Sequence, residues 1–163
     1  MTEIRQVGPD DDDGVRALSR LRAAWAAEDA GLEYKRPTGG RLGTGRDASF
    51  EQEFRAWLRS EPRGFFLAVG ADGEAMGMCN VLLFTRMLRP GSAPSCWAYL
   101  ANVYVMPSSR GHGVGGSLVR AAADQAHACG AVRLVTAPSG PSRSLYIRHG
   151  FRAANELLVL PRP

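Results

Sequence analysis

Four glycines within six positions, Gly111 to Gly116, are the part of this sequence whose residue types point most directly to chemistry. They lie in VYVMPSSRGHGVGGSLV, residues 103–119, where an apolar strand-like segment leads through a turn into a helix-like segment. Glycines at a helix start leave backbone N–H groups unshielded and directed at one point, an arrangement that binds phosphate. Arg110 adds a positive charge and Ser117 a hydroxyl, so the spacing predicts an anion site.

Two ligand-binding patterns overlap in this loop. Gly111, Gly113 and Gly116 spell G-x-G-x-x-G, the pattern of a dinucleotide-binding turn, and from Arg110 the same stretch spells R-x-x-G-x-G. A dinucleotide turn begins directly after its strand and has an acidic residue about 20 positions further on. Here five residues separate Val105 from Gly111, and the corresponding downstream segment, LVTAPSG, has no acid. The dinucleotide interpretation is therefore rejected.

The composition indicates an ordinary globular chain. It has 163 residues, of which 45% are hydrophobic and 22% charged, which fits one domain over residues 1–163 with a core of its own. The net charge of +4 admits an anionic ligand. The basic residues are scattered along the chain, whereas a nucleic-acid-binding module gathers them with aromatic residues on one face. We therefore expect no nucleic-acid partner, and that class stays the weakest of three functional interpretations.

The compartment and metal content follow from what the sequence lacks. No apolar run reaches the length of about 18 residues that a membrane span needs. The segment MTEIRQVGPDDDD has neither the basic head nor the apolar run of a signal peptide. The three cysteines lack the spacing of a disulfide framework or a zinc site. We expect a cytoplasmic protein with no membrane partner and no metal.

Hydrophobic periodicity predicts a mixed α/β (α+β) domain in the order βααβββαβαβ. Helices are expected from 10–13 to near 31, from 47 or 49 to 60, from the glycine loop to 130, and over 142–149. Strands are expected over 3–7, 65–69, 75–88, 96–105, 132–137 and 151–160. The Gly31–Asp47 segment has no period and reads as a long loop, which in a compact domain is more often functional or mobile than merely structural.

Two elements of the chain resemble the GNAT N-acetyltransferase superfamily. The first is the glycine loop, which is similar to the family's acetyl-coenzyme A loop, R/Q-x-x-G-x-G/A, after a strand and a short Pro-containing turn. The second is SGPSRSLYIRHGF, residues 139–151, which is similar to N-x-x-A-x-x-L-Y-x-x-x-G-F, with Ser139 and Ser142 in place of Asn and Ala. The resemblance covers Cys96–Phe151 and implies a mixed, mostly antiparallel sheet flanked by helices.

The resemblance also implies a site for acetyl-CoA or coenzyme A. The backbone of Val103 and Val105, on either side of Tyr104, would hydrogen-bond the pantetheine arm where the strand parts from its neighbour. Ser139 would lie near that arm in place of the family's Asn. The pyrophosphate would be held by the loop and helix start, namely Arg110, Gly111, His112, Gly113, Val114, Gly115, Gly116 and Ser117.

Tyr146 matches the family's tyrosine that is taken as general acid. A phenol within hydrogen-bond reach can protonate the coenzyme A thiolate as an amine attacks the thioester. From the sequence alone, a core tyrosine is about equally compatible. The general base is open, because CWAYLANVYV and VRLVTA, the two strands expected beside the thioester, contain no Asp, Glu or His. A water ordered by Cys96, Tyr99 or Asn102 is one alternative, and an acid at Glu28, Asp29 or Glu33 is another.

The acceptor is expected to be a small-molecule or peptide amine that attacks directly in a ternary complex. Candidate acceptor-binding residues are Trp25, Glu28, Asp29, Tyr34 and Tyr99, with core packing or a solvated helix end as the alternative for each. A non-enzymatic acyl-CoA-binding or regulatory domain is the second functional interpretation. Few residues follow Phe151, so we expect a homodimer in which the partner chain or the 31–47 loop completes the acceptor pocket.

Overall fold

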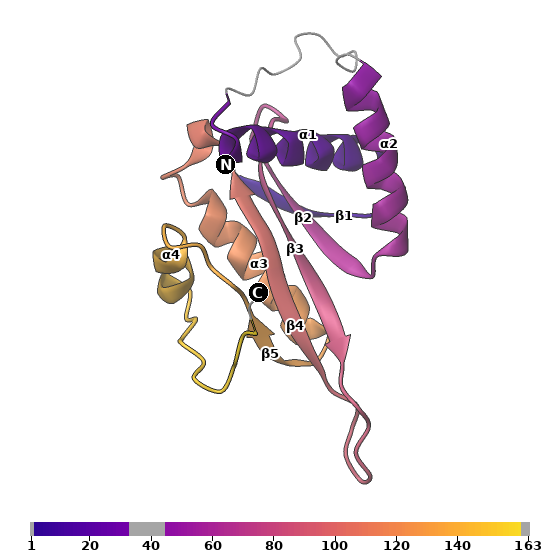
Figure 1. Ribbon diagram of the computed structural model, residues 1–163, viewed down its shortest axis with the longest axis vertical. Coiled ribbons are helices and arrows are strands. Elements are labelled where there is room, and N and C mark those ends of the chain that lie inside the picture. The colour runs from indigo at the N-terminus through magenta and orange to yellow at the C-terminus, as the bar shows by residue number, and fades with distance from the viewer. Residues whose placement is uncertain (1, 33–44, 161–163) are drawn as a thin grey trace.

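The computed structural model describes residues 2–32 and 45–160, without the side chains of 45–48. One five-stranded sheet runs through them in the order β1-β2-β3-β4-β5. All neighbouring strands are antiparallel except β4 and β5, which are parallel. The strands are β1 (Glu3–Val7), β2 (Arg63–Val69), β3 (Ala75–Thr85), β4 (Cys96–Val105) and β5 (Ala131–Val135) (Figure 1).

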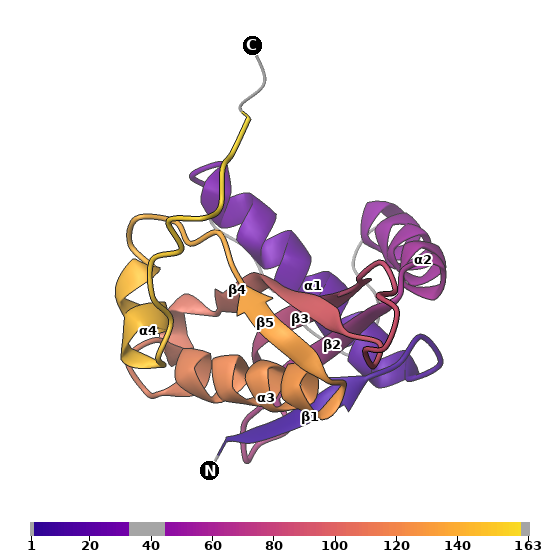
Figure 2. The same ribbon diagram turned by 90° about the horizontal axis from the view of Figure 1, so that it is seen from below.

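Helices cover both faces of the sheet. Figure 2 shows α1 and α2 on one side and α3 on the other, with α4 beside the end of α3. Their bounds are α1 (Asp12–Asp29), α2 (Gly45–Ser60), α3 (Val114–Ala128) and α4 (Arg143–Arg148). No helix among residues 2–32 and 45–160 has the length and apolar character needed to cross a membrane.

The two faces of the sheet are buried in two separate cores. Along β2 the side chains alternate, so Phe65 and Leu67 lie in the core under α1 and α2, while Phe66 and Ala68 lie in the core under α3. Leu18 is fully buried in the α1 core, as its spacing predicts. The sheet therefore separates the core under α1 and α2 from the core under α3.

The acidic run at the start of α1 caps that helix. The Asp11 carboxylate accepts a hydrogen bond from the backbone N–H of Gly14 at 2.9 Å, and Asp12 and Asp13 occupy the first turn. Negative charge here is favourable because the first N–H groups of a helix have no partner within it. The predicted helix start is confirmed.

A β-bulge interrupts the pairing of β3 with β4. Ala101 pairs with Asn80, but Tyr104 pairs with Met78, so three steps along β4 match two along β3. Asn102, inside the extra step, has a φ of 55°, which is unusual for a residue other than glycine. The bulge therefore inserts one residue into β4.

The inserted residue changes which side chains of β4 face α3. Ala98 and Leu100, before the bulge, belong to the core under α3, and so do Val103 and Val105 after it. Strict alternation would have sent one of these pairs to the other face. Tyr104 consequently lies in the core under α1.

Several predicted boundaries differ from the structure by a few residues, and one predicted strand is absent. Helix α2 begins at Gly45, before the predicted caps Asp47 and Ser49. The strand predicted over residues 151–160 is not formed, and Leu158 and Leu160 are 95% and 96% exposed. Alternating apolar residues favour a strand only where a neighbouring strand can pair with them, and the described chain offers this segment none. The other elements follow the predicted order.

Candidate functional site

The glycine loop forms an open cradle of backbone donors at the start of α3. Gly111 and Gly113 have φ angles of 79° and 81°, and a Cβ built on either would have no atom within 4 Å. Gly113 is the N-cap of α3 and no side chain caps the helix there. Ser117 is the first residue whose N–H bonds back to the loop, to the Gly113 carbonyl at 3.0 Å. The N–H groups of the first turn are thus free of intrahelical partners, as an anion site requires.

The other two glycines of the loop serve packing. A Cβ on Gly116 would lie 2.6 Å from Nε2 of His149, and a Cβ on Gly115 would lie 3.3 Å from Leu145. His149 is held in place because its Nδ1 lies 2.9 Å from the Leu145 carbonyl oxygen. The absence of side chains at these positions lets α4, which carries Tyr146, lie directly against α3. The sequence pattern did not reveal this role.

The edge of β4 beside the loop is open. The pairing of β4 with β5 ends at Tyr99 and Val135, while β4 continues to Val105. The N–H of Met106 donates to Met76 on the β3 side at 2.9 Å, so by alternation the backbone groups of Val105 face the opposite, open side. The predicted pantetheine contacts at Val103 and Val105 therefore lie on a strand edge that β5 does not cover.

Arg110 is engaged by protein groups. Its Nε donates to the Val105 carbonyl at 3.0 Å, and its NH2 group lies 2.8 Å from both oxygens of Glu28. The hydrogen bond from Arg110 is the main reason why the pKa of Glu28 is lowered; burial opposes it, and the Tyr104 hydroxyl contributes to it. The positive charge predicted for an anion is thus largely matched by a carboxylate.

Three of the predicted acceptor residues gather around Tyr104. Trp25 stacks on the Tyr104 ring with centroids 5.7 Å apart, and the Trp25 indole donates to Asp29 at 3.2 Å. The Tyr104 hydroxyl donates to Glu28 at 3.2 Å. Burial, with the hydrogen bond to Glu28, raises the pKa of Tyr104 to about 12. These contacts attach the end of α1 to β4. Tyr34 lies outside the described residues.

Tyr146 lies on the α3 side of the sheet, level with the bulge. It is 6% exposed and meets the Phe151 ring edge to face, with centroids 5.5 Å apart. Burial raises its pKa; a hydrogen bond with Thr136 partly offsets this, and Cys79 and Tyr99 add to it. Tyr146 is therefore protonated at neutral pH, which a proton donor needs to be. Tyr99 is thus near enough to Tyr146 to affect its pKa.

Ser139 precedes α4 in an exposed turn. Its hydroxyl lies 2.9 Å from that of Ser142, and Ser142 also donates to the Ser139 carbonyl at 3.0 Å. The two residues that depart from the family pattern therefore bond to each other. Cys79, on β3 opposite the bulge, is buried and its thiol pKa is raised to about 12, so it is not a nucleophile.

A cavity of about 380 Å³ lies on the other face of the sheet, between α2, α1 and strands β2 to β4. Its lining is Arg22, Phe50, Glu53, Phe54, Trp57, Phe65, Met78, Asn80 and Asn102. Asn102 belongs to the bulge, so the cavity reaches the part of β4 that is not paired with β5. The aromatic residues of α2 have the spacing of a core-facing helix side, so the sequence gives no sign of the cavity.

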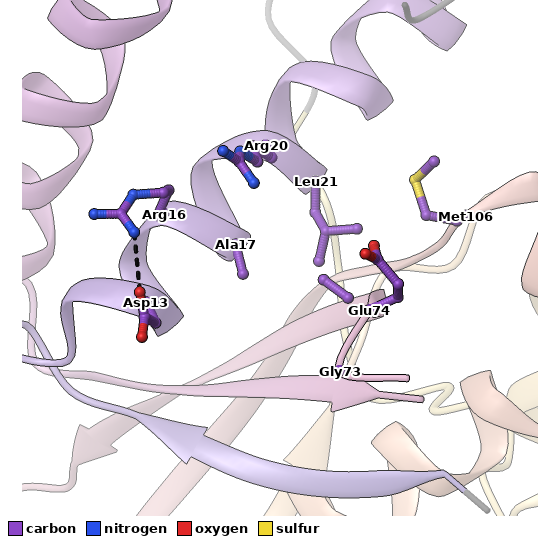
Figure 3. Close-up of a pocket in the computed structure, with 9 residues that line it drawn as sticks. Asp13, Arg16, Ala17, Arg20, Leu21, Gly73, Glu74 and Met106 are labelled. Atoms are coloured by element: carbon purple, nitrogen blue, oxygen red, sulfur yellow. Dashed lines mark hydrogen bonds and ion pairs between the residues drawn. The ribbon is translucent and has the colours of Figure 1, made fainter. Parts of the chain in front are cut away.

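A second cavity, of about 260 Å³, lies beside the β2–β3 turn and is lined by α1 (Figure 3). Arg16 and Arg20 contribute positive charge, and Asp13 and Glu74 contribute negative charge, with Arg16 bonded to Asp13 at 2.9 Å. It contains no residue of the bulge or of the glycine loop, whereas Asn102, one of the residues expected to order a water, lines the 380 Å³ cavity. The cradle, the open edge and the 380 Å³ cavity are therefore the candidate site.

Comparison with known proteins gives one family and several relatives. Residues 28–151 match the model of the acetyltransferase (GNAT) family. The chain is similar to aminoglycoside N(6')-acetyltransferase type 1 of Klebsiella aerogenes, with 30% identity over 118 residues, covering 68% of this chain and 74% of that protein.

Three solved structures illustrate the shared fold. One is a predicted acetyltransferase from Clostridium acetobutylicum with acetyl-CoA, at 18% identity and a TM-score of 0.65, covering 99% of this chain and 96% of that one. Another is an aminoglycoside acetyltransferase from an uncultured soil metagenomic sample, at 16% identity and a TM-score of 0.67, covering 100% and 99%. The third is a transcriptional regulator from Bacillus halodurans, at 19% identity and a TM-score of 0.70, covering 99% and 100%.

Proposed function

The chain belongs to the GNAT acetyltransferase family, and from this premise we propose that it transfers the acetyl group of acetyl-CoA to a primary amine by direct attack. The observation that carries the proposal is the open edge of β4, which leads from the glycine cradle to the bulge. A pyrophosphate at the cradle would find unpaired N–H groups, and an amide-containing arm could lie along the part of β4 that β5 does not cover, where the Val105 carbonyl is bonded to Arg110.

The donor side of the site uses main-chain groups. The N–H groups from Gly111 to Gly116 would hold the pyrophosphate, and the backbone of Val103 and Val105 the pantetheine arm. Arg110 would act mainly through its bonds to Val105 and Glu28, which fix the end of β4 next to the cradle. This fit requires no metal ion. The backbone of β4 near Asn102 would then flank the thioester.

Tyr146 would serve the leaving thiolate. The amine nitrogen forms a bond to the thioester carbonyl carbon, the carbon–sulfur bond breaks, and the sulfur takes the proton of the Tyr146 hydroxyl. The nitrogen loses its proton to water, and the Tyr146 phenolate regains a proton from water. The raised pKa of Tyr146 keeps that proton available at neutral pH. Its place opposite the bulge, beside Cys79 and Tyr99, supports this role.

We propose that no carboxylate acts as an essential base. Glu28 is the best candidate by position, but its pKa is lowered by Arg110, whereas an effective base has a pKa near the working pH. A water held near Asn102 or Tyr99, or binding of the amine in its neutral form, would remove the need for one. The acceptor class is a small-molecule amine; an aminoglycoside, as in the name of the Klebsiella relative, is one member of it.

The test is release of free thiol from acetyl-CoA in the presence of a panel of primary amines. Release that depends on the amine is the expected result. A protein that binds coenzyme A but releases no thiol with any amine of the panel would instead be an acyl-CoA-binding or regulatory domain. The missing strand carboxylate favours that alternative. The transcriptional regulator among the structural relatives shows that this fold is not confined to proteins named as acetyltransferases.

We also propose a cytoplasmic homodimer in which residues 1–163 form one domain. Two described segments carry exposed apolar side chains that a partner could cover. Met87, in the loop between β3 and β4, is 92% exposed. Leu158 and Leu160, which follow α4, are 95% and 96% exposed. All three cysteines are free, which suits a reducing compartment. Light scattering at working concentration tests the dimer, and a monomer would contradict it.

A further inference from the structure

The 380 Å³ cavity is walled by aromatic rings. Phe54 and Trp57 lie three residues apart on α2, with ring centroids 5.7 Å apart. Both rings contact the Phe65 ring of β2 nearly edge to face, with centroid distances of 6.2 Å from Phe54 and 5.8 Å from Trp57. Phe50 extends this row one turn earlier on α2, 5.9 Å from Phe54. Such walls bind a flat apolar group through offset and edge-to-face contacts.

One polar atom in the cavity lacks a partner. Asn80 is 1% exposed, and its Oδ1 accepts no hydrogen bond from any described residue. A buried acceptor without a donor is unfavourable unless a ligand or water supplies one. Asn80 pairs with Ala101, the residue before Asn102, so its amide lies next to the bulge. The cavity thus joins an apolar space to one acceptor atom close to the reacting end of the proposed acetyl donor.

The charge around the cavity does not suit a polycation. Among the described lining residues, one carboxylate, Glu53, and one guanidinium, Arg22, are present, and both are exposed. Arg22 also lies over the Trp25 ring at 5.0 Å. An aminoglycoside carries several ammonium groups, and each needs a carboxylate or other acceptor when it leaves water. The lining offers one carboxylate and the amide oxygens of Asn80 and Asn102.

We propose that this cavity is the acceptor site and that it takes a primary amine carried on an aromatic ring. The ring packs against the cavity-facing surfaces of the α2 aromatics and Phe65, and an N–H of the amine donates to Oδ1 of Asn80. This inference rests on the proposed acetyl transfer, and it specifies the acceptor for that reaction. The amine then stands beside Asn102, across β4 from the open edge.

The first experiment compares three acceptors in the thiol-release assay: 2-phenylethylamine, n-butylamine and kanamycin. Removing the ring takes away the aromatic contacts, so kcat/KM for 2-phenylethylamine should exceed that for n-butylamine by about tenfold or more. It should exceed the value for kanamycin as well. Equal values for the ring and chain amines, or a preference for kanamycin, would overturn the inference while leaving acetyl transfer intact. No thiol release with any amine would instead refute the proposed function.

The second experiment replaces Asn80 with leucine, which has a similar shape and no polar atom. Because the Asn80 oxygen has no partner, Asn80→Leu should leave the Tm unchanged or raise it, while kcat/KM for 2-phenylethylamine falls about tenfold. Ser19→Ala is the matched control, since Ser19 is also buried but donates to the Arg16 carbonyl at 2.9 Å. It should lower the Tm and leave kcat/KM unchanged. An Asn80→Leu protein with a lowered Tm or an unchanged kcat/KM would overturn the role of Asn80.

The third experiment uses a residue whose change does not threaten folding. Trp57 is 37% exposed, so Trp57→Leu should fold even if Asn80→Leu does not. It should reduce the preference for 2-phenylethylamine over n-butylamine by about fivefold, because the ring loses a wall while the amine keeps its acceptor. A purely structural role of Trp57 would affect both amines alike, and an unchanged preference would count against the aromatic site.

Discussion

The two sides of β4 recognise their proposed ligands in different ways. On the α3 side, the cradle and the open edge consist of backbone N–H and C=O groups, and the side chains there are small or turned away. On the α1 and α2 side, the cavity consists of side chains from five elements, which extend along the sequence from Arg22 to Asn102. Main-chain recognition tolerates many sequences, whereas side-chain recognition depends on which residues the chain carries. The donor is thus specified by the fold and the acceptor by this particular sequence.

The largest effect is expected from Gly113→Asp, which attacks the main-chain side. The change adds a Cβ at a φ of 81° and places a negative charge where the pyrophosphate would bind. Coenzyme A affinity, measured by calorimetry, should fall about a thousandfold or more, since like charges in contact cost several kcal/mol.

A matched control separates the charge from backbone strain. Gly73 also has a positive φ, 79°, and open space around its missing Cβ, but it lies in the β2–β3 turn. Gly73→Asp should lose a similar amount of stability and keep its coenzyme A affinity. Equal affinity in the two folded variants would remove the cradle from the donor site.

A smaller effect is expected from Tyr146→Phe, which keeps the packing against Phe151 and removes the hydroxyl. If that hydroxyl protonates the thiolate, kcat should fall between about tenfold and a thousandfold with little change in coenzyme A affinity. The raised pKa of Tyr146 means that the wild type should keep this advantage throughout the neutral pH range.

Tyr104→Phe provides the comparison on the opposite face. It also removes a hydroxyl from a buried ring, in this case one bonded to Glu28. Its effect on kcat should be much smaller than that of Tyr146→Phe. A Tyr146→Phe enzyme with the kcat of the wild type would reduce Tyr146 to a packing role.

Glu28→Gln tests the contacts of Glu28 with Arg110 and Tyr104, which join the end of α1 to β4 and the glycine loop. Because Glu28 binds Arg110 and Tyr104, the amide should raise KM for the amine a few-fold, about two to five, and lower kcat less than that. Asp29→Asn is the control, since Asp29 lies next to Glu28 and bonds only the exposed edge of Trp25. A hundredfold loss of kcat that recovers at high pH would identify Glu28 as a base and contradict the proposal.

The smallest effect is on stability in acid. The pKa of Glu28 is lowered in the folded protein, so its ionised form contributes stability above its unfolded value of about 4.5 and loses that contribution as the pH falls through the folded value. The Tm difference between wild type and Glu28→Gln should be about 1–3 °C at pH 7, because the pair is partly exposed, and should shrink progressively as the pH falls below about 4.5. A difference that does not shrink in acid would mean that the ion pair is not its cause.

The parts that the sequence predicted are those encoded by local pattern. β1 and β4 have the predicted bounds, and the glycine loop leads into α3 as its spacing indicates. These features depend on alternation and on glycine at positions of positive φ, which a single sequence displays. The other expectations for the donor site came from the family resemblance.

The parts that escaped prediction depend on contacts between distant residues. Arg110 and Glu28 are 82 positions apart in the sequence, with β2, β3 and β4 between them, and nothing in either neighbourhood indicates the pair. Phe50, Phe54 and Trp57 have the spacing of a core helix face. That spacing does not reveal that these side chains and Asn80 of β3 line a cavity. The absent strand at 151–160 has the same cause, since a strand's pattern does not reveal whether a neighbour is there to pair with it.

The bulge at Asn102 can be described as a shift of half a period in the side-chain pattern of β4. Removing that one residue would exchange the faces of the last third of the strand, sending Tyr104 towards α3 and Val105 towards α1. Tyr104 would then lose the Trp25 ring and the Glu28 carboxylate that attach α1 to the sheet. The side chains that the end of β4 presents to each core and the seating of α1 are therefore set by the same residue.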